Sequence, residues 1–287
     1  MRRRWLAGVV MALAIGGVAA GGMAPGVRLE QEVRALGSRV SREIAWQGAA
    51  RRVTIRARLT GPLREVGVAE QRIEIARADR GVVWALDPAT RRYRELSFSQ
   101  IQQRLAAGAR GDAPNLRTYR AGEARVDVRP ADGRRVIAGL ACERLRAELA
   151  VPVTVVATSE RATARFEFDA WVTRDPRLLE AIRAFDGPYE AATGTTATLA
   201  EVEALTGEWT DVFVVHMPAL LRQVREHGYP LSLRMQVIWE FAPTRPGERP
   251  RRRSLGEVVT ETRRVAFGPL PASEFQLPDG YTRQSEP

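Results

Sequence analysis

Apolar and polar residues alternate along much of this chain, which is the pattern of β-strands with one buried and one wetter face. The pattern is densest in residues 134–176, which predict three consecutive strands of one antiparallel sheet. In the second of these strands Leu145, Ala147 and Leu149 share one face, and charged residues alternate with them. The most regular alternation lies over residues 231–241, where six large apolar side chains share a face.

Further strands follow from the same pattern, separated by turns that contain Gly, Pro or Asp. They are predicted over residues 51–60, 70–77, 82–87, 91–96, 123–129 and 254–267. Residues 27–36 fit either a strand or a short helix. Pro130 to Gly133 is expected to be a turn, and Phe275 and Leu277 of the tail are expected to dock on the body. Short turns between strands indicate an antiparallel meander.

Four segments have helical spacing instead. They are residues 97–109, 176–187, 198–205 and 210–226. Ser97 or Ser99 is expected to cap the first helix. Asp175 is a suitable N-cap for the second helix, Pro176 is a suitable first residue, and Gly187-Pro188 is expected to end it.

The N-terminus has the pattern of a secretory signal peptide cleaved near Ala20. Arg2, Arg3 and Arg4 form a positive region, and residues 5–20 are uncharged and rich in Ala, Val, Leu and Gly. We therefore expect export to the periplasm. An uncleaved membrane anchor is the alternative, although the apolar run is short for a membrane-spanning helix.

The formal net charge is +10, and all 44 basic residues are arginine. Because 34 acidic residues are interspersed among them, the excess is expected to be a solvated face, and we expect no nucleic-acid partner. Residues 243–253, PTRPGERPRRR, predict a Pro- and Arg-rich hairpin loop. A basic contact for nucleic acid or anionic lipid is the alternative to a solvated loop there.

Residues with catalytic or metal-binding chemistry are few. The single cysteine, Cys142, excludes an intramolecular disulfide and is expected to be a small buried side chain; a reactive thiol or an intermolecular disulfide is the alternative. His216 and His227 are the only histidines, so the usual soft-metal spacings are absent. Glu167 and Asp169 share a strand face, where solvated charges are commoner than paired catalytic carboxylates. We expect no enzyme activity, no cofactor and no metal.

Four segments, in this order, resemble one family of exported bacterial proteins, the domain-of-unknown-function family 4412. They are GVVWALDPATRRYREL at 81–96, GLACERL at 139–145, FDAWVTRDP at 168–176 and FQLPDGY at 275–281. That family is similar in fold to the LolA-like periplasmic lipoprotein carriers. The resemblance covers most of residues 27–282, and no ligand-contact motif of the carriers aligns with this chain.

The resemblance implies an α+β fold in which a strongly curved antiparallel sheet, a half-open barrel, has helices across its concave face. Residues 25–287 would then form a single LolA-like domain. A helical insertion at about 187–228 departs from the compact carriers and leaves the shape of the ligand mouth open.

We therefore predict a non-enzymatic periplasmic protein, expected to be a monomer with peripheral contact to the envelope. It would bind an apolar or lipid-like ligand, such as a lipoprotein acyl chain, inside the half-barrel. The residues expected to line that cavity are Trp84, Leu86, Phe166, Phe168, Met235, Val237 and Trp239. For each of them a purely structural core role is the alternative. The rival functions are a structural or protein-interaction module of the envelope, and a hydrolase with unrecognised carboxylates.

Overall fold

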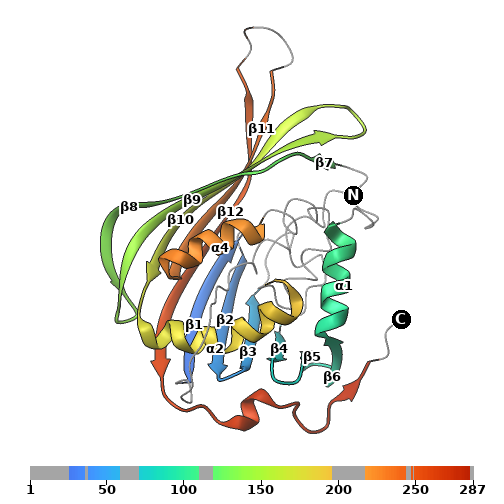
Figure 1. The fold of residues 1–287 in the computed structure, drawn as a ribbon, viewed down its shortest axis with the longest axis vertical. Helices are drawn as coiled ribbons and strands as arrows, with labels where there is room; N and C mark the ends of the chain where they lie inside the picture. The colour runs from blue at the N-terminus through green and yellow to red at the C-terminus, as the bar shows by residue number, and fades with distance from the viewer. Residues whose placement is uncertain are drawn as a thin grey trace.

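The computed structural model describes residues 26–35, 38–58, 71–109, 119–195, 217–243, 247 and 249–284. They form an α+β architecture, a large and mainly antiparallel sheet with helices on one of its faces (Figure 1). The strands are β1 (Val27–Ala35), β2 (Ser38–Gln47), β3 (Ala50–Arg58), β4 (Gln71–Arg77), β5 (Val82–Asp87), β6 (Arg92–Ser97), β7 (Tyr119–Ala121), β8 (Arg125–Ile137), β9 (Leu140–Val155), β10 (Arg161–Thr173), β11 (Tyr229–Phe241), β12 (Arg251–Phe267) and β13 (Thr282–Arg283). The helices are α1 (Phe98–Ala109), α2 (Pro176–Thr193) and α4 (Met217–His227), with a short 3₁₀ turn η5 (Ala272–Phe275).

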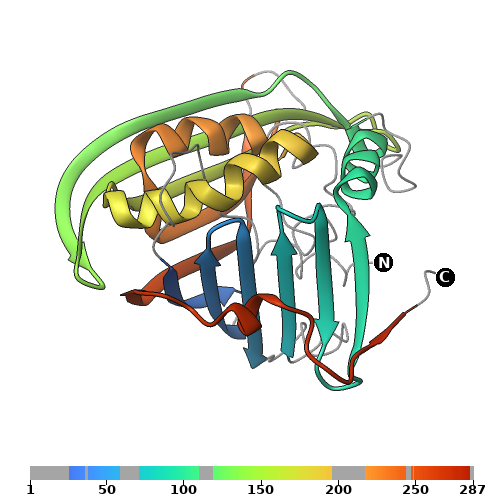
Figure 2. The same ribbon diagram turned by 60° about the horizontal axis from the view of Figure 1, so that its bottom comes forward.

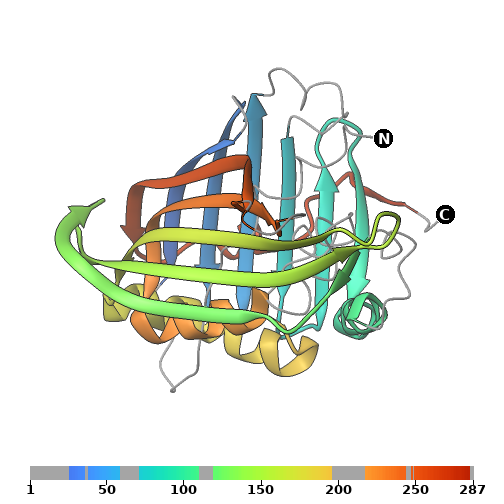
Figure 3. The ribbon, with the colours of Figure 1, turned by 90° about the horizontal axis from the view of Figure 1, so that it is seen from above.

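The sheet consists of two meanders joined side by side. Its strand order is β13-β6-β5-β4-β3-β2-β1-β12-β11-β10-β9-β7, with β8 also paired to β9, and it does not close into a barrel. Strands β1 to β6 form the first meander and β9 to β12 the second, with β1 pairing antiparallel to β12. In Figure 3 the strands β8, β9 and β10 run across the direction of β2 to β6.

The helices lie between the first and the second meander, as Figure 2 shows. Helix α2 contacts β2 and α1, and α4 contacts β8 and β9. We call the helix-covered side of the sheet the inner face and the opposite side the outer face. The main hydrophobic core lies on the inner face, where buried side chains from both meanders meet the apolar sides of the helices.

Capping side chains place the helix starts where the sequence predicted them. At α1, Ser97 Oγ accepts a hydrogen bond from Gln100 N at 3.2 Å, and Gln100 Oε1 accepts one from Ser97 N at 2.8 Å. This reciprocal pair is a capping box. At α2, the Asp175 carboxylate accepts from two backbone N–H groups of the first turn, and Pro176 follows as the first helical residue.

The predicted end of α2 near Gly187-Pro188 is wrong. The helix continues through this pair to a left-handed C-cap at Gly194, whose φ is 74°. Tyr189 is fully buried, with its ring 4.8 Å from that of Phe98 and 5.5 Å from that of Phe185. Packing of the helix against α1 therefore outweighs the loss of one backbone donor at the proline.

The predicted turn at residues 130–133 is also wrong. The three strands predicted within residues 134–176 are present, but the first of them is the end of a longer strand, β8, which pairs with β9 on both sides of an irregularity between Ala131 and Arg134. Among the described strands β8 pairs only with β9, so it is an edge strand. Pro130 is tolerated there because an edge strand needs ladder donors on one side only.

The tail docks on the body, as predicted, and the structure places it on the outer face of the first meander. Phe275 is 2% exposed and packs with Ala45 and Ala50. Leu277 and Tyr281 pack farther along the same face. The tail ends as β13, whose pairing with β6 is parallel. The tail is therefore a third layer on this half of the sheet.

Several other predictions have simple outcomes. The segment that fitted either a strand or a helix is strand β1. The signal peptide at 1–20, the helix at 198–205 and residues 210–216 of the last helix lie outside the described residues. Between β10 and β11 the chain leaves the sheet over residues 174–228, which include α2 and α4, and we call this segment the helical excursion. The insertion expected at about 187–228 falls within it, and residues 196–216 lie outside the described residues.

Candidate functional site

Five of the seven predicted cavity residues lie together on the inner face of two neighbouring strands. Phe166 and Phe168 of β10 stand opposite Val237 and Met235 of β11, and Trp239 stands opposite Ala164. The five side chains are at most 6% exposed. We call these five residues the inner stripe. They form one continuous apolar surface because alternate positions of paired strands face the same way.

Trp84 and Leu86 are not part of this surface. They belong to a separate buried cluster with Ile73 and Ile75, which Leu277 and Tyr281 of the tail cover. Their neighbours Val83 and Ala85 on β5 belong to the main core instead. Strand β5 is thus buried on both faces, and its tryptophan faces away from the helices.

The helical excursion leaves and rejoins the sheet at one point. Thr173, the last residue of β10, pairs directly with Tyr229, the first residue of β11. Gly228 fits between them with φ of 130°, where a Cβ would lie 2.4 Å from the Thr173 carbonyl oxygen. Arg174 Nε donates to the His227 carbonyl oxygen at 3.0 Å. The excursion is therefore an insertion that interrupts no pairing between β10 and β11.

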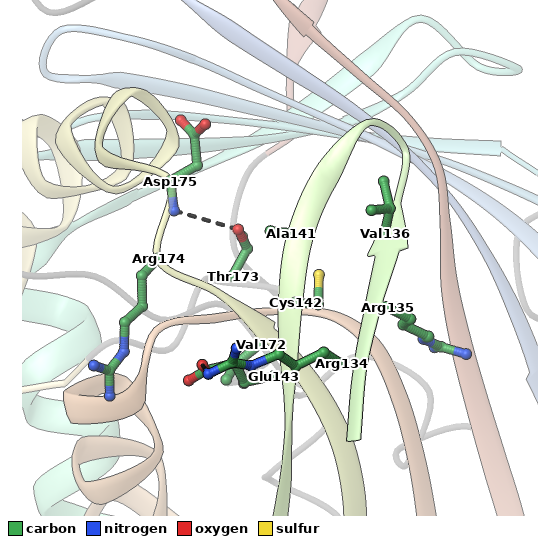
Figure 4. A pocket seen from close by; sticks show the side chains of 10 residues that line it. All are labelled: Arg134, Arg135, Val136, Ala141, Cys142, Glu143, Val172, Thr173, Arg174 and Asp175. Atoms are coloured by element: carbon green, nitrogen blue, oxygen red, sulfur yellow. Dashed lines mark hydrogen bonds and ion pairs between the residues drawn. The ribbon is translucent and has the colours of Figure 1, made fainter. Parts of the chain in front are cut away.

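A cleft of about 680 Å³ opens beside this junction (Figure 4). Its walls are the hairpin of β8 and β9, the end of β10, and the first residues of the excursion. A smaller cleft of about 270 Å³ shares Arg134, Glu143 and Arg174 with it and reaches His227. A molecule bound here would touch both the sheet and the root of the excursion.

The charges of this cleft are only partly balanced. Arg134 lies 3.4 Å from Glu143. The Arg177 guanidinium holds the pKa of the Asp175 carboxyl below its usual range. Arg135 stacks 4.4 Å from the Trp171 ring centroid. In Figure 4 the Arg135 and Arg174 side chains point away from one another, so the cleft has a positive excess without a focused anion site.

Cys142 lies at the base of the cleft and is 2% exposed. Burial raises the pKa of its thiol to about 11, so the thiol is protonated at neutral pH. A protonated, buried thiol is a poor nucleophile and a poor metal ligand. Within the residues that the structure describes, no cluster of three or more His, Cys, Asp and Glu side chains could hold a metal ion.

The sequence interpretation missed a group of buried charges on the inner side of the first meander. They are Arg42, Arg51, Glu74 and Asp186. Arg51 is 1% exposed and its guanidinium carbon lies 6.0 Å from the Phe185 ring centroid. The sequence contained a signal for the burial of Arg51, because it lies two residues before Val53 and therefore faces the same side of the strand. The inner face is therefore apolar on both meanders, and this group of buried charges lies within the apolar surface of the first.

No family model matches this chain, and no curated protein matches it either. Among the described residues, no helix is long and apolar enough to cross a membrane.

Proposed function

We propose that this protein binds an apolar or lipid-like ligand, such as a lipoprotein acyl chain, between the inner stripe and the helical excursion, and catalyses no reaction. The inner stripe is the observation that carries the proposal. It places three aromatic and two aliphatic side chains on one continuous surface. Ligand pockets are mostly apolar with a few placed polar groups, and the buried charges of the first meander would supply those groups.

In this proposal the sheet is an open half-barrel, the shape that the resemblance to the LolA-like carriers implies, and the excursion is its lid. Both ends of the excursion meet at Thr173 and Tyr229, and β10 and β11 remain paired without it. Lifting α2 and α4 would therefore remove side-chain packing but would leave the hydrogen bonds between the strands in place. Such a motion requires less free energy than opening the sheet itself.

The proposal includes export to the periplasm. Residues 1–20 support it through the pattern of three arginines followed by an apolar run. An exported protein with an apolar binding face would suit the carriage of a molecule that water dissolves poorly.

Binding is favoured over hydrolysis by the state of the candidate reactive groups. Asp169, one of the two carboxylates considered from the sequence, is on the outer face, where Arg144 lowers its pKa. A general acid at neutral pH needs a raised pKa instead. The Cys142 thiol is held protonated, as described above.

The second candidate is a structural or protein-interaction module in which the helices fill the inner face permanently. The observation that favours it is the burial of the inner stripe, since even Trp239 is only 4% exposed. The two functions differ in whether this face separates from its cover when a ligand is present.

The proposal can be tested by measuring the stability of the wild type and of Trp239→Ala. Each is measured with and without a long-chain fatty acid below its micelle concentration. If the stripe borders a space that opens for ligand, the free energy of unfolding should fall by about 1–2 kcal/mol, because fewer contacts are lost. The fatty acid should raise the wild-type melting temperature, since a ligand at 100 times its Kd adds about 2.7 kcal/mol. Denaturant and thermal melts measure both quantities.

Trp171→Ala is the matched control, because Trp171 lies on the outer face of β10. It should leave the shift caused by fatty acid unchanged. A loss of about 3–5 kcal/mol for Trp239→Ala, as for a close-packed aromatic, together with no shift in the wild type, would favour the permanently filled sheet.

A further inference from the structure

An arginine-rich tip stands at the far end of the second meander. It consists of five exposed arginines: Arg161 at the start of β10, Arg249 just before β12, and Arg251, Arg252 and Arg253 at the start of β12. We call these residues the basic tip. Figure 1 shows the hairpin of β11 and β12 projecting beyond the rest of the sheet at this end. Its arginines can therefore reach a surface that the body of the protein does not touch.

Carboxylates neutralise only part of the basic tip. Arg251 lies 2.8 Å from Glu160, and Arg252 lies 3.2 Å from Glu240. Glu240 also accepts a hydrogen bond from Arg165 at 2.9 Å, so its charge is shared. The other three arginines form no ion pair with any described residue. Counted over the residues that the structure describes, the tip thus presents a net positive charge of at least three.

An exposed aliphatic side chain lies beside these arginines. Val156 is 42% exposed, one of two large apolar side chains that the described residues expose, and it lies in the turn between β9 and β10. The backbone of Val155 bonds to that of Glu160 at 2.9 Å, and Glu160 pairs with Arg251 across the two hairpins. The arginines and the valine therefore belong to one small surface.

We propose that the basic tip docks on a bilayer surface that carries anionic phospholipid headgroups. Arginines at a bilayer surface are attracted by its negative potential, and an aliphatic side chain beside them can enter the interface. Nucleic acid fits less well, because Val156 offers no stacking surface for a base. The inner stripe ends at this side of β11, so docking would bring the Trp239 end of the inner face close to the bilayer. The inference stands independently of the ligand proposed above.

Sedimentation with phosphatidylcholine vesicles, with and without phosphatidylglycerol, tests the proposal on the full chain. The wild type should bind only the vesicles that contain phosphatidylglycerol. Binding should weaken strongly between about 0.1 M and about 1 M salt, where the Debye length falls from about 10 Å to about 3 Å. The double variant Arg249→Glu with Arg253→Glu should lower the affinity for these vesicles at least about thirty-fold. Each arginine near an anionic bilayer raises the affinity by about a factor of five.

Arg80→Glu with Arg222→Glu is the matched control. Both positions are exposed, lie away from the tip, and give the same change in net charge. This variant should keep most of the vesicle binding, and melting curves of both variants check that they fold. Equal losses in the two variants would overturn the proposal, because net charge alone would then explain binding. No binding of the wild type to anionic vesicles, or binding of duplex DNA in their place, would overturn it too.

Discussion

The outer faces of the two meanders come from the same alternation of residues, but one is charged and solvated and the other is apolar and covered. On the second meander the outer face is a ladder of arginine and carboxylate side chains that water reaches. Arg144 donates to Asp169 at 2.9 Å, and Arg165 bonds to both Glu148 and Glu240. On the first meander the outer face of β4 and β5 is apolar, and the tail covers it.

This difference shows what stabilises each half. Ion pairs on an exposed face contribute roughly 0–1 kcal/mol each, because water and salt screen them. Covered apolar area contributes about 25 cal/mol per Å², so one buried tryptophan outweighs several such pairs. The first meander is therefore held on two faces, and the second is held mainly by its inner face. The inner stripe is thus on the half that has no second cover.

The largest expected effect separates two tryptophans on these outer faces. Trp84→Ala should lower the free energy of unfolding by about 3–5 kcal/mol, because its ring is 7% exposed beneath the tail and its Nε1 donates to Glu95. Trp171→Ala should cost less, about 1 kcal/mol, since its ring is only partly buried, between the Arg135 and Arg144 guanidinium groups and beside Gly133. Urea melts of both variants measure the two values. Similar values would mean that the ladder protects its face as well as the tail does.

The next largest loss of stability is expected when the tail that covers the first meander is altered. Leu277→Ala should cost about 2 kcal/mol, at the low end for a buried leucine because the side chain is only half-buried against the Trp84 cluster. The tryptophan fluorescence of the protein should also shift toward longer wavelength as water reaches Trp84. Gln276→Ala, an exposed neighbour in the same tail, is the control and should change neither quantity. An unchanged stability for Leu277→Ala would show that the tail merely rests on the sheet.

Cys142→Ala measures a small buried side chain in the second meander. We expect a loss of about 1–2 kcal/mol and unchanged ligand binding. Because the folded pKa of the thiol is raised to about 11, the wild type should lose stability as the pH rises from about 9 toward that value, and the variant should lack this loss. Melts across that pH range test it. Loss of binding in a folded Cys142→Ala protein would instead make the thiol functional.

The smallest effect is expected from the ladder. Asp169→Asn should cost at most about 1 kcal/mol, because the pair with Arg144 is one third exposed and is screened by solvent. The folded pKa of Asp169 is lowered from 3.8, so its contribution is present above that pH and disappears as the pH falls through the lower folded value. Wild type and variant should therefore converge in acid. A difference that persists there would contradict the ion-pair explanation.

Local chemistry made much of this fold predictable from the sequence. The capping box at Ser97 and the N-cap at Asp175 use residues that are neighbours in the chain, so no distant partner is needed to recognise them. The face shared by Leu231 to Phe241 follows from alternation within one strand. The inner stripe could be predicted for the same reason, although the sequence resemblance supplied the idea of a binding face.

The tertiary structure decided which side of each strand meets which layer. Val82 to Leu86 is a continuous apolar run, and such a run indicates burial on both faces without saying which face meets the helices and which meets the tail. Likewise Arg51 follows the inner parity of β3, and α2 passes through Gly187-Pro188, because partners far away in the sequence cover them. Alternation within a strand predicts which side chains share a face. Which layer covers that face depends on segments that are far away in the sequence.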